Sequence, residues 1–284
     1  MKETIQSSPY GDKTGEHMLT EFEGAGELTH YIATTTPNKH AEQDSRRKDD
    51  SWHGGVTYEQ ASDLAETGWS DAPRLTGSDI ANNLRDYAEG QREGTIASVS
   101  GAFLDMGAYC SGQPECFQEF AEVETPRGVV LGVNIGALSD ISPSEMTNRG
   151  VVLMAIVDEL ERNGFSVSLE AFWHSRLHKG DNENWSTLRF PLKRMGERVD
   201  ENLLAFWACH PAALRQMGFA WQECHDDVWV KRMDVNGGRG QSRDPENLEG
   251  IDYLFGSTRL PRTEEQTLVY YKSAMAGIEK VLAS

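Results

Sequence analysis

The chain has 284 residues, 38% hydrophobic and 25% charged, and its 27 Lys and Arg stand against 45 Asp and Glu for a formal net charge of −18. This composition is typical of a folded globular protein and excludes a collagen-like chain. No apolar run reaches the roughly 18 residues that a membrane span needs, and the first residues hold no apolar core of a signal peptide, so we predict neither. A chain this acidic repels phosphate backbones, which argues against nucleic-acid binding except at a local basic patch.

The acidic residues concentrate in the first half of the chain. Residues 1–150 contain 25 acidic and 11 basic residues, whereas residues 151–284 contain 20 and 16. Such asymmetry indicates either a solvated acidic face or a surface for a basic partner. The four cysteines do not have the spacing of a structural zinc site, so we expect reduced thiols at Cys110, Cys116, Cys209 and Cys224.

The chain begins with a polar segment. Residues 1–50 show no sustained hydrophobic period, and Ser, Thr, Gly, Asn, Glu and Lys dominate them. Few apolar side chains are present to offset the entropy of ordering, so we predict a flexible, partly disordered acidic arm with one short strand at 28–33. Residues 51–284 are predicted to form an α/β domain.

Helix and strand signals alternate from residue 52 onwards. Thr57 and Gln60 have the spacing of a capping box, which predicts a helix over 57–67. Further along, the sequence predicts a helix over 79–89, a strand over 95–103, and short helical or turn structure over 105–120.

The central segment has the clearest pattern. Residues 128–135 form a nearly continuous apolar run, which is typical of a strand buried on both faces. Apolar residues at helical spacing follow over 144–162, and alternation follows over 165–173. Strand, helix and strand in this order predict a right-handed βαβ crossover and therefore a parallel strand pair.

The last third continues the same alternation. We predict strands over 185–192, 228–230 and 251–255, and helices over 201–209, 211–217 and 263–282. The glycine-rich segment 236–240 is predicted to be a mobile hairpin tip, because it lacks the residue order of a phosphate-binding loop. Together the patterns predict an α/β fold with a mixed, largely parallel sheet flanked by helices.

The loop after the central strand is the first candidate site. Ligands of open α/β sheets bind outside the carboxyl ends of strands, and the oxygens here suit Mg²⁺. The candidate ligands are Asn134, Ser139 and Asp140, joined by Asp226 from an acidic pair. The loop resembles the Asp-x-Ser-x-Ser metal loop of von Willebrand A domains, although Asn134 replaces the aspartate and Gly136 and Leu138 replace the serines. An ordinary helix-entry turn is the alternative interpretation.

The second candidate site is the basic stretch from 174 to 198. Cations interleaved with aromatic side chains can stack nucleic-acid bases and bind phosphates. The residues proposed for this role are Arg176, Lys179, Arg189, Lys193, Arg194 and Trp185. The alternative is a solvated loop with Trp173 and Trp185 in the core at its ends.

No motif assigns a reaction. The sequence contains no Gly-x-Ser-x-Gly elbow, and the adjacent pairs Cys209-His210 and Asp226-Asp227 are common in chains without catalytic function. We therefore name no catalytic residue and expect no cofactor other than the Mg²⁺ considered above.

Several segments resemble a family of proteins from tailed bacteriophages, prophages and related mobile elements. They are Gly68-Trp69, Gly101 to Met106, Gly112 to Cys116, Arg149-Gly150, and Leu204 to Pro211 before Leu214-Arg215. The similarity spans roughly residues 52–282. It implies a viral or mobile-element origin, a place in the host cytoplasm or the virion, and a von Willebrand A-like or Rossmann-like core; it supplies no activity.

These observations lead to two functional hypotheses. The first is a protein that acts by binding other proteins, as a virion or assembly component, without catalytic activity. The alternative is a nucleic-acid-processing accessory that uses the basic stretch and the loop at 134–142.

Overall fold

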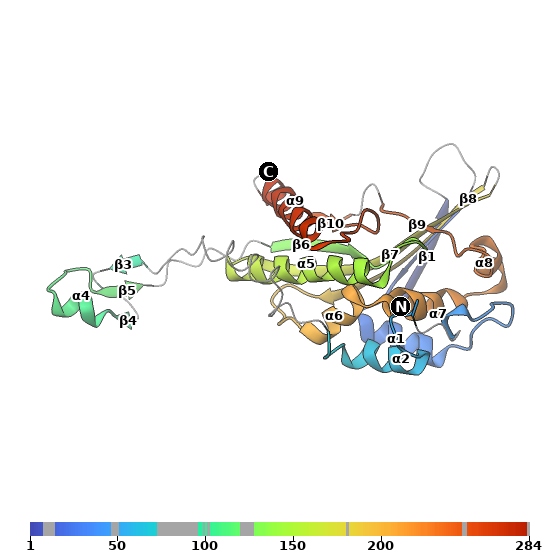
Figure 1. Cartoon of the computed structure of the whole chain (residues 1–284), viewed down its shortest axis with the longest axis horizontal. Helices are drawn as coiled ribbons and strands as arrows, with labels where there is room; N and C mark the ends of the chain where they lie inside the picture. The colour runs from blue at the N-terminus through green and yellow to red at the C-terminus, as the bar shows by residue number, and fades with distance from the viewer. Residues whose placement is uncertain are drawn as a thin grey trace.

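A seven-stranded mixed sheet with helices around it forms the body of the protein (Figure 1). The computed structural model describes residues 1–7, 15–46, 51–72, 96–98, 100, 103–119, 128–179, 182–245 and 249–282. The predicted α/β class is confirmed. Within these ranges no helix is both long enough and apolar enough to span a bilayer.

The strands of the main sheet lie in the order β1-β2-β8-β7-β6-β10. Parallel pairs join β6 to β7, β6 to β10 and β2 to β8, while β1 pairs antiparallel with β2, β7 with β8, and β9 with β7. The bounds are β1 Lys2–Ser7, β2 Glu16–Glu21, β6 Gly128–Asn134, β7 Ser166–Lys179, β8 Asn182–Lys193, β9 Gln241–Ser242 and β10 Tyr253–Phe255.

Helices cover one face of this sheet. In Figure 1, α5 and α6 lie below the strands with α1 and α2 beneath them, and α9 lies above α5 beside β10. The helical segments are α1 Ala25–Thr34, η1 Asp44–Arg46, α2 Tyr58–Thr67, α5 Pro143–Arg162, α6 Glu201–Cys209, η3 Ala213–Gly218, α7 Phe219–Glu223, α8 Asp227–Arg232 and α9 Glu264–Leu282. A separate small sheet, in the order β3-β5-β4, consists of β3 Ile96–Ser98, β4 Phe103–Leu104 and β5 Phe117–Glu119 beside α4 Met106–Cys110.

The predicted βαβ crossover is present as β6, α5 and β7. A capping box starts α5, since the Ser142 hydroxyl accepts from the Glu145 amide and the Glu145 carboxylate accepts from the Ser142 amide. Strands β6 and β7 then pair in parallel from Gly128 with Ser166 to Asn134 with Phe172. The apolar run at 128–135 therefore forms an inner strand of the sheet, between β7 and the edge strand β10.

The two faces of β7 have different environments. Leu169, Ala171 and Trp173 on the first face are at most 3% exposed, and Trp173 contacts Phe219 and Trp221 of the helical layer. Glu170 lies on the second face, where it is half-buried and pairs with a neighbouring arginine. This alternation explains why only one face is apolar enough to bind helices.

The prediction of a disordered arm over 1–50 is wrong for the residues that the structure describes. β1 and β2 extend the sheet beyond β8, and α1 contains the residues that we predicted as a short strand. Phe22, Leu28 and Ile32 are at most 4% exposed and belong to the main core. The sequence pattern did not reveal this, because the apolar residues of this segment are divided among elements too short to show a period. The residues that bury them lie far away in sequence.

Two predictions near the carboxyl end of the chain also fail. Residues 228–230 lie in the helix α8, because Asp226 accepts a hydrogen bond from the Trp229 amide at 2.8 Å and caps the helix. The predicted mobile tip at 236–240 contains a buried arginine, Arg239, whose Nη2 lies 2.6 Å from Glu223 and 3.2 Å from Asp44. A buried ion pair of this kind holds the glycine-rich turn in place.

The remaining elements lie close to the predicted ranges. The helix expected over 211–217 includes the π-helical turn η3 and continues as α7. In place of the single strand expected over 95–103, the structure has two short strands, β3 and β4, which pair with β5 on opposite sides. The predicted helix at 79–89 lies outside the described residues.

Leu28→Ala tests whether the N-terminal segment is part of the core. Deleting a fully buried leucine side chain leaves a cavity, so we expect the free energy of unfolding to fall by about 2–5 kcal/mol in chemical denaturation. Val228→Ala, at a 55% exposed valine, is the control and should change stability little. An unchanged denaturation midpoint for Leu28→Ala would restore the disordered arm.

Candidate functional site

A crevice opens where β6 and β10 end. The chain leaves β6 towards α5 and β7 on one side, whereas β10 lies on the other side of β6. Connections that diverge from neighbouring parallel strands leave a crevice at their carboxyl ends, where α/β proteins bind ligands. In this protein the crevice is a hollow of about 910 Å³.

Three segments line the crevice: the loop between β6 and α5, the loop between β10 and α9, and the first turns of α9. Its apolar residues are Leu138, Ile141, Leu260, Pro261, Val269 and Tyr270. Its charged residues are Asp140, Glu145, Arg259, Arg262 and Glu265. An apolar lining with charges at a few points is the usual composition of a binding site.

Glu145 and Arg262 link two of these segments. The Nε of Arg262 donates to the Glu145 carboxylate at 2.8 Å, and Ser142 donates to the same group from its amide and its hydroxyl. Burial alone would raise the pKa of Glu145, but the hydrogen bonds from Ser142 and Arg262 outweigh it and the pKa is lowered. Glu145 is therefore ionised at neutral pH and holds the two loops together.

A buried arginine supports the crevice from behind. The Nη1 of Arg149, on α5, donates to the carbonyls of Asn134, Gly136 and Gly256 at 2.5, 3.3 and 3.4 Å, and Nη2 donates to Ala208 at 3.4 Å. Arg149 is 1% exposed. One guanidinium thus fixes the end of β6, the loop after β10 and the end of α6.

A second arginine holds the other end of the same loop. Arg215, in η3, donates to the Ile141 carbonyl at 2.6 Å and to the Trp52 carbonyl at 2.7 Å, with its guanidinium over the Trp52 ring. The loop from 135 to 141 is therefore held by a buried guanidinium at each end. Such a loop is preformed rather than ordered on binding, which lowers the entropy cost of a complex.

The residues proposed for Mg²⁺ do not form a cluster. The Asn134 amide nitrogen donates to Asp244 and to the Arg243 carbonyl, and its oxygen accepts from the Gly136 amide. Ser139 and Asp140 are exposed in the loop after β6, where Asp140 lines the crevice, while Asp226 caps α8. No group of three or more His, Cys, Asp or Glu side chains placed to bind a metal occurs among the described residues.

The geometry explains why Asn134 fits a structural role better than a metal ligand. Its carbonyl oxygen is turned towards the backbone of its own loop, and its amide nitrogen is a hydrogen-bond donor that a cation would repel. Asp244, which accepts from Asn134, also accepts from the amide of Ser257 and the hydroxyl of Thr258. Asn134 thus donates to a carboxylate that another segment of the chain supplies.

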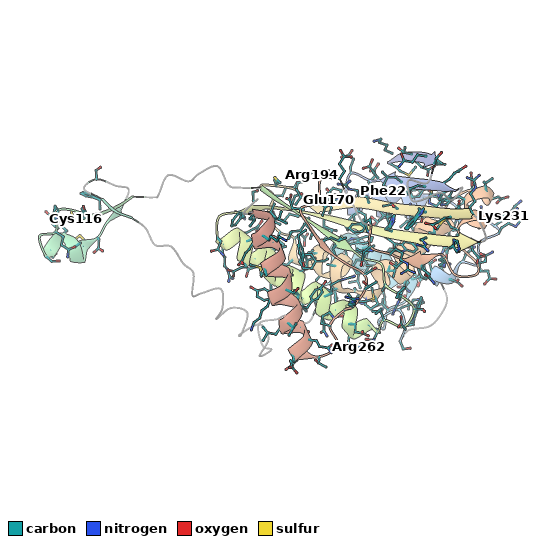
Figure 2. The ribbon with its side chains drawn as sticks, turned by 90° about the horizontal axis from the view of Figure 1, so that it is seen from above. Phe22, Cys116, Glu170, Arg194, Lys231 and Arg262 are labelled. Atoms are coloured by element: carbon teal, nitrogen blue, oxygen red, sulfur yellow. The ribbon has the colours of Figure 1, made fainter. Side chains whose placement is uncertain are left out.

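The basic stretch forms a hairpin rather than a loop, since β7 continues to residue 179. Its cations consequently lie at different points along two long strands. Arg176 lies near the tip of the hairpin, whereas Arg194 follows the other end of β8, where Figure 2 labels it. Only Arg176 and Trp185 lie together, as a cross-strand pair with a cation–π distance of 5.6 Å. The described side chains do not form one basic and aromatic surface.

The other predicted nucleic-acid ligands have internal partners. Arg189 pairs with Glu170 at 3.2 Å, and Arg194 pairs with Glu23 at 3.3 Å. Lys193 is 4% exposed and lies 2.6 Å from Glu161. The side chain of Lys179 is outside the described part of the chain. Sequence spacing could not distinguish these structural ion pairs from free cations.

A buried pair of histidines lies on the second face of the sheet. The Thr187 hydroxyl is 2.6 Å from Nδ1 of His174 and 2.8 Å from Nε2 of His17, so a single hydroxyl connects both rings. Burial, assisted by the neighbouring His17, lowers the pKa of His174 to about 3, and burial lowers the pKa of His17. Both rings are neutral at physiological pH.

The sequence predicted no role for four residues that shape these sites: Arg149, Arg215, Asp244 and His17. Each acts through contacts to segments distant in sequence, so no local pattern identifies it. The one available signal was a pair of charged residues, Arg149 and Arg215, inside strongly apolar helical stretches.

Comparisons with known proteins give one match. The family model described as "Domain of unknown function (DUF7192)" matches residues 3–273. No curated protein and no solved structure matches the chain. The matched range includes the N-terminal strands, the crevice and most of α9.

Arg149→Met should remove the support behind the crevice. Four buried carbonyls would lose a charged donor, so we expect the free energy of unfolding to fall by about 3 kcal/mol or more. The matched control is Arg162→Met on the same helix, where an exposed pair with Asp158 contributes less than about 1 kcal/mol. Equal losses of unfolding free energy for the two variants in urea denaturation would show that the buried hydrogen bonds of Arg149 contribute no more than an exposed ion pair.

Stability should decrease as the pH falls below 6.5. The unfolded His174 binds a proton near its ordinary pKa of 6.5, whereas the folded residue, with a pKa of about 3, does not. Acid therefore favours the unfolded chain, and this residue alone should lower stability by about 2 kcal/mol between pH 7 and pH 5. His174→Gln should remove that part of the pH dependence, whereas His178→Gln, at an exposed position of the same strand, should retain it.

Proposed function

We propose that this chain, which belongs to the family of the domain of unknown function DUF7192, binds a segment of another protein in the crevice beside β6 and β10. The observation that carries the proposal is a preformed hollow of about 910 Å³ with an apolar lining at the carboxyl ends of two parallel strands.

The crevice offers apolar surface that water covers in the unbound chain. Val269, in α9, is 62% exposed although it faces a hollow lined by Leu260 and Pro261. Burying such a side chain against a partner contributes about 1.5 kcal/mol or more. The loop at 135–141 is already fixed by Arg149 and Arg215, so little of this gain is lost in ordering the site.

The charges around the crevice and on the whole chain favour one kind of partner. Glu145 and Arg262 neutralise each other, which leaves Asp140 and Glu265 against Arg259 at the rim. The whole chain carries −18, and its field attracts cationic partners over distances of about a Debye length. We therefore propose a partner segment that combines apolar residues with lysine or arginine.

The nucleic-acid hypothesis has weaker support. It needs a continuous row of available cations, whereas Arg189, Lys193 and Arg194 are engaged in ion pairs. A viral or mobile-element origin, and with it a role in assembly in the host cytoplasm or the virion, stays part of the proposal. Its support is the resemblance in segments such as those ending at Met106 and Cys116.

Substitution of Val269 tests the crevice. Peptides selected from a random displayed library against the native chain should be apolar with lysine or arginine. Val269→Lys removes an apolar contact and adds a like charge, so we expect at least about tenfold weaker binding in fluorescence anisotropy. Val269→Glu removes the same contact but attracts the peptide, so its loss should be smaller.

Val228→Lys is the matched control, because this valine is 55% exposed on a different helix, α8. It should leave the affinity unchanged. Selection of acidic peptides, or equal losses for the Val228 and Val269 variants, would contradict the proposed site.

A further inference from the structure

We propose a second binding site: a recess beyond the end of β6, built on the extended β7–β8 hairpin, that binds a small organic anion through Arg176 and Arg243. The recess has a volume of about 310 Å³ and is separate from the crevice described above in its lining residues. A site of this size accommodates one small molecule.

The position of the recess follows from strand length. β6 ends at Asn134 opposite Phe172, but β7 and β8 continue together to Lys179 and Asn182. In this extension Arg176 lies directly opposite Trp185, and both lie on the second face of the sheet with His174 and Glu183. The segment from Arg243 to Pro245 forms the other wall.

The strand side of the recess is rigid. The rings of His174 and Trp185 stack with their centroids 4.7 Å apart and an interplanar angle of 23°. Thr187 and His17 hold His174 from the far side, and the Arg176 guanidinium lies 5.6 Å from the Trp185 ring. His174 and Trp185 are at most 6% exposed, so this wall does not need to be ordered when a ligand binds.

Neither arginine of the recess has a hydrogen-bonded carboxylate among the residues that the structure describes. Arg176 lies 3.9 Å from Glu183, a distance too long for a hydrogen bond. Arg243 donates to the neutral amide of Gln241 at 2.7 Å and has no carboxylate partner among the described residues. The Asp244 carboxylate also lines the recess, but its hydrogen bonds come from Asn134, Ser257 and Thr258 rather than from either arginine. Both guanidinium groups therefore keep N–H donors that a bound anion can accept from.

Arg176 and Arg243 differ from most arginines of this acidic chain in lacking a close carboxylate, and Arg243 is exposed, so a ligand from solvent can reach it. With a net charge of −18, the protein supplies carboxylates in abundance, and most of its partly buried arginines have one. A recess that keeps Arg243 without a carboxylate, beside a weakly paired Arg176, is complementary to an anionic group. Guanidinium groups bind the oxygens of carboxylates and phosphates through charged hydrogen bonds.

The aromatic wall selects an organic rather than a bare inorganic anion. Trp185 and Pro245 provide apolar surface next to the two arginines. A ligand with a flat or apolar body and one anionic group would contact both. Carboxylates and phosphates share this chemistry, and the experiment distinguishes them.

Benzoate and phenyl phosphate are suitable probes, because they carry the same ring and differ in the anionic group. Isothermal titration calorimetry with the full chain should give a Kd at or below about 1 mM for at least one of them. Acetate and inorganic phosphate should bind at least about tenfold more weakly, because they lack the ring. Arg243→Gln should weaken binding of the preferred probe by about tenfold or more, because one charged contact is lost.

Two further variants make the result specific. Arg259→Gln, which removes an exposed arginine from the crevice, should leave the affinity unchanged. Glu183→Gln keeps the shape of the side chain and removes its charge, so it should strengthen binding, an effect that misfolding cannot produce. Absence of binding by both ring probes up to 10 mM (roughly the limit of a useful site), or equal losses for the Arg243 and Arg259 variants, would overturn the proposal.

Discussion

The architecture depends on one charged side chain, Arg149, that is buried away from water. The guanidinium of Arg149 is buried at the centre of the fold, and its partners in hydrogen bonding are backbone carbonyls rather than a carboxylate. Burial lowers the pKa of this group, and the neighbouring Cys209 and Tyr270, whose pKa values burial raises to about 12, remain neutral beside it. A buried charge is stable only when hydrogen bonds replace its water. Carbonyls must therefore converge on the guanidinium from three segments: the end of β6, the loop after β10 and the end of α6. The arginine thus determines how these segments lie together.

Buried cations recur at the other junctions of the molecule. Arg215 joins η3 to the segment around Trp52 and to the loop after β6, and Arg239 joins the glycine-rich turn to Glu223 and Asp44. In each case a long side chain with several donors connects elements that share no hydrogen-bonded ladder. The crevice and the recess lie next to these junctions, in loops that are irregular in conformation yet fixed in position. Rigid loops on an α/β scaffold are the usual location of binding sites.

Local patterns predicted the central elements well. The apolar run at 128–135, the helical spacing over 144–162 and the alternation over 165–173 each depend on neighbours within a few residues, and all correspond to observed elements. The prediction failed where long-range pairing decides the outcome, as for Phe22 and Leu28, which are buried by strands and helices distant in sequence. It failed again at Trp229, where a single capping carboxylate outweighed β-prone neighbours. Among the candidate site residues, Arg176 and Trp185 do form a pair. Lys193 and Asn134 instead make internal contacts, to Glu161 and Asp244 respectively.

The pairing of β2 with β8 has a consequence for biosynthesis. His17 lies beside Trp185, so the strand that is made near the beginning of the chain must wait for one made 168 residues later. At ordinary translation rates this interval is about 10 to 30 seconds. During that time the apolar side chains of β2 and α1 have no sheet to cover, and the nascent chain is a candidate for chaperone binding. The β1–β2 edge of the sheet therefore cannot form before β8 is made, and the opposite edge waits longer still, for β10. The ribosome, rather than the local sequence, sets the earliest moment at which the fold can close.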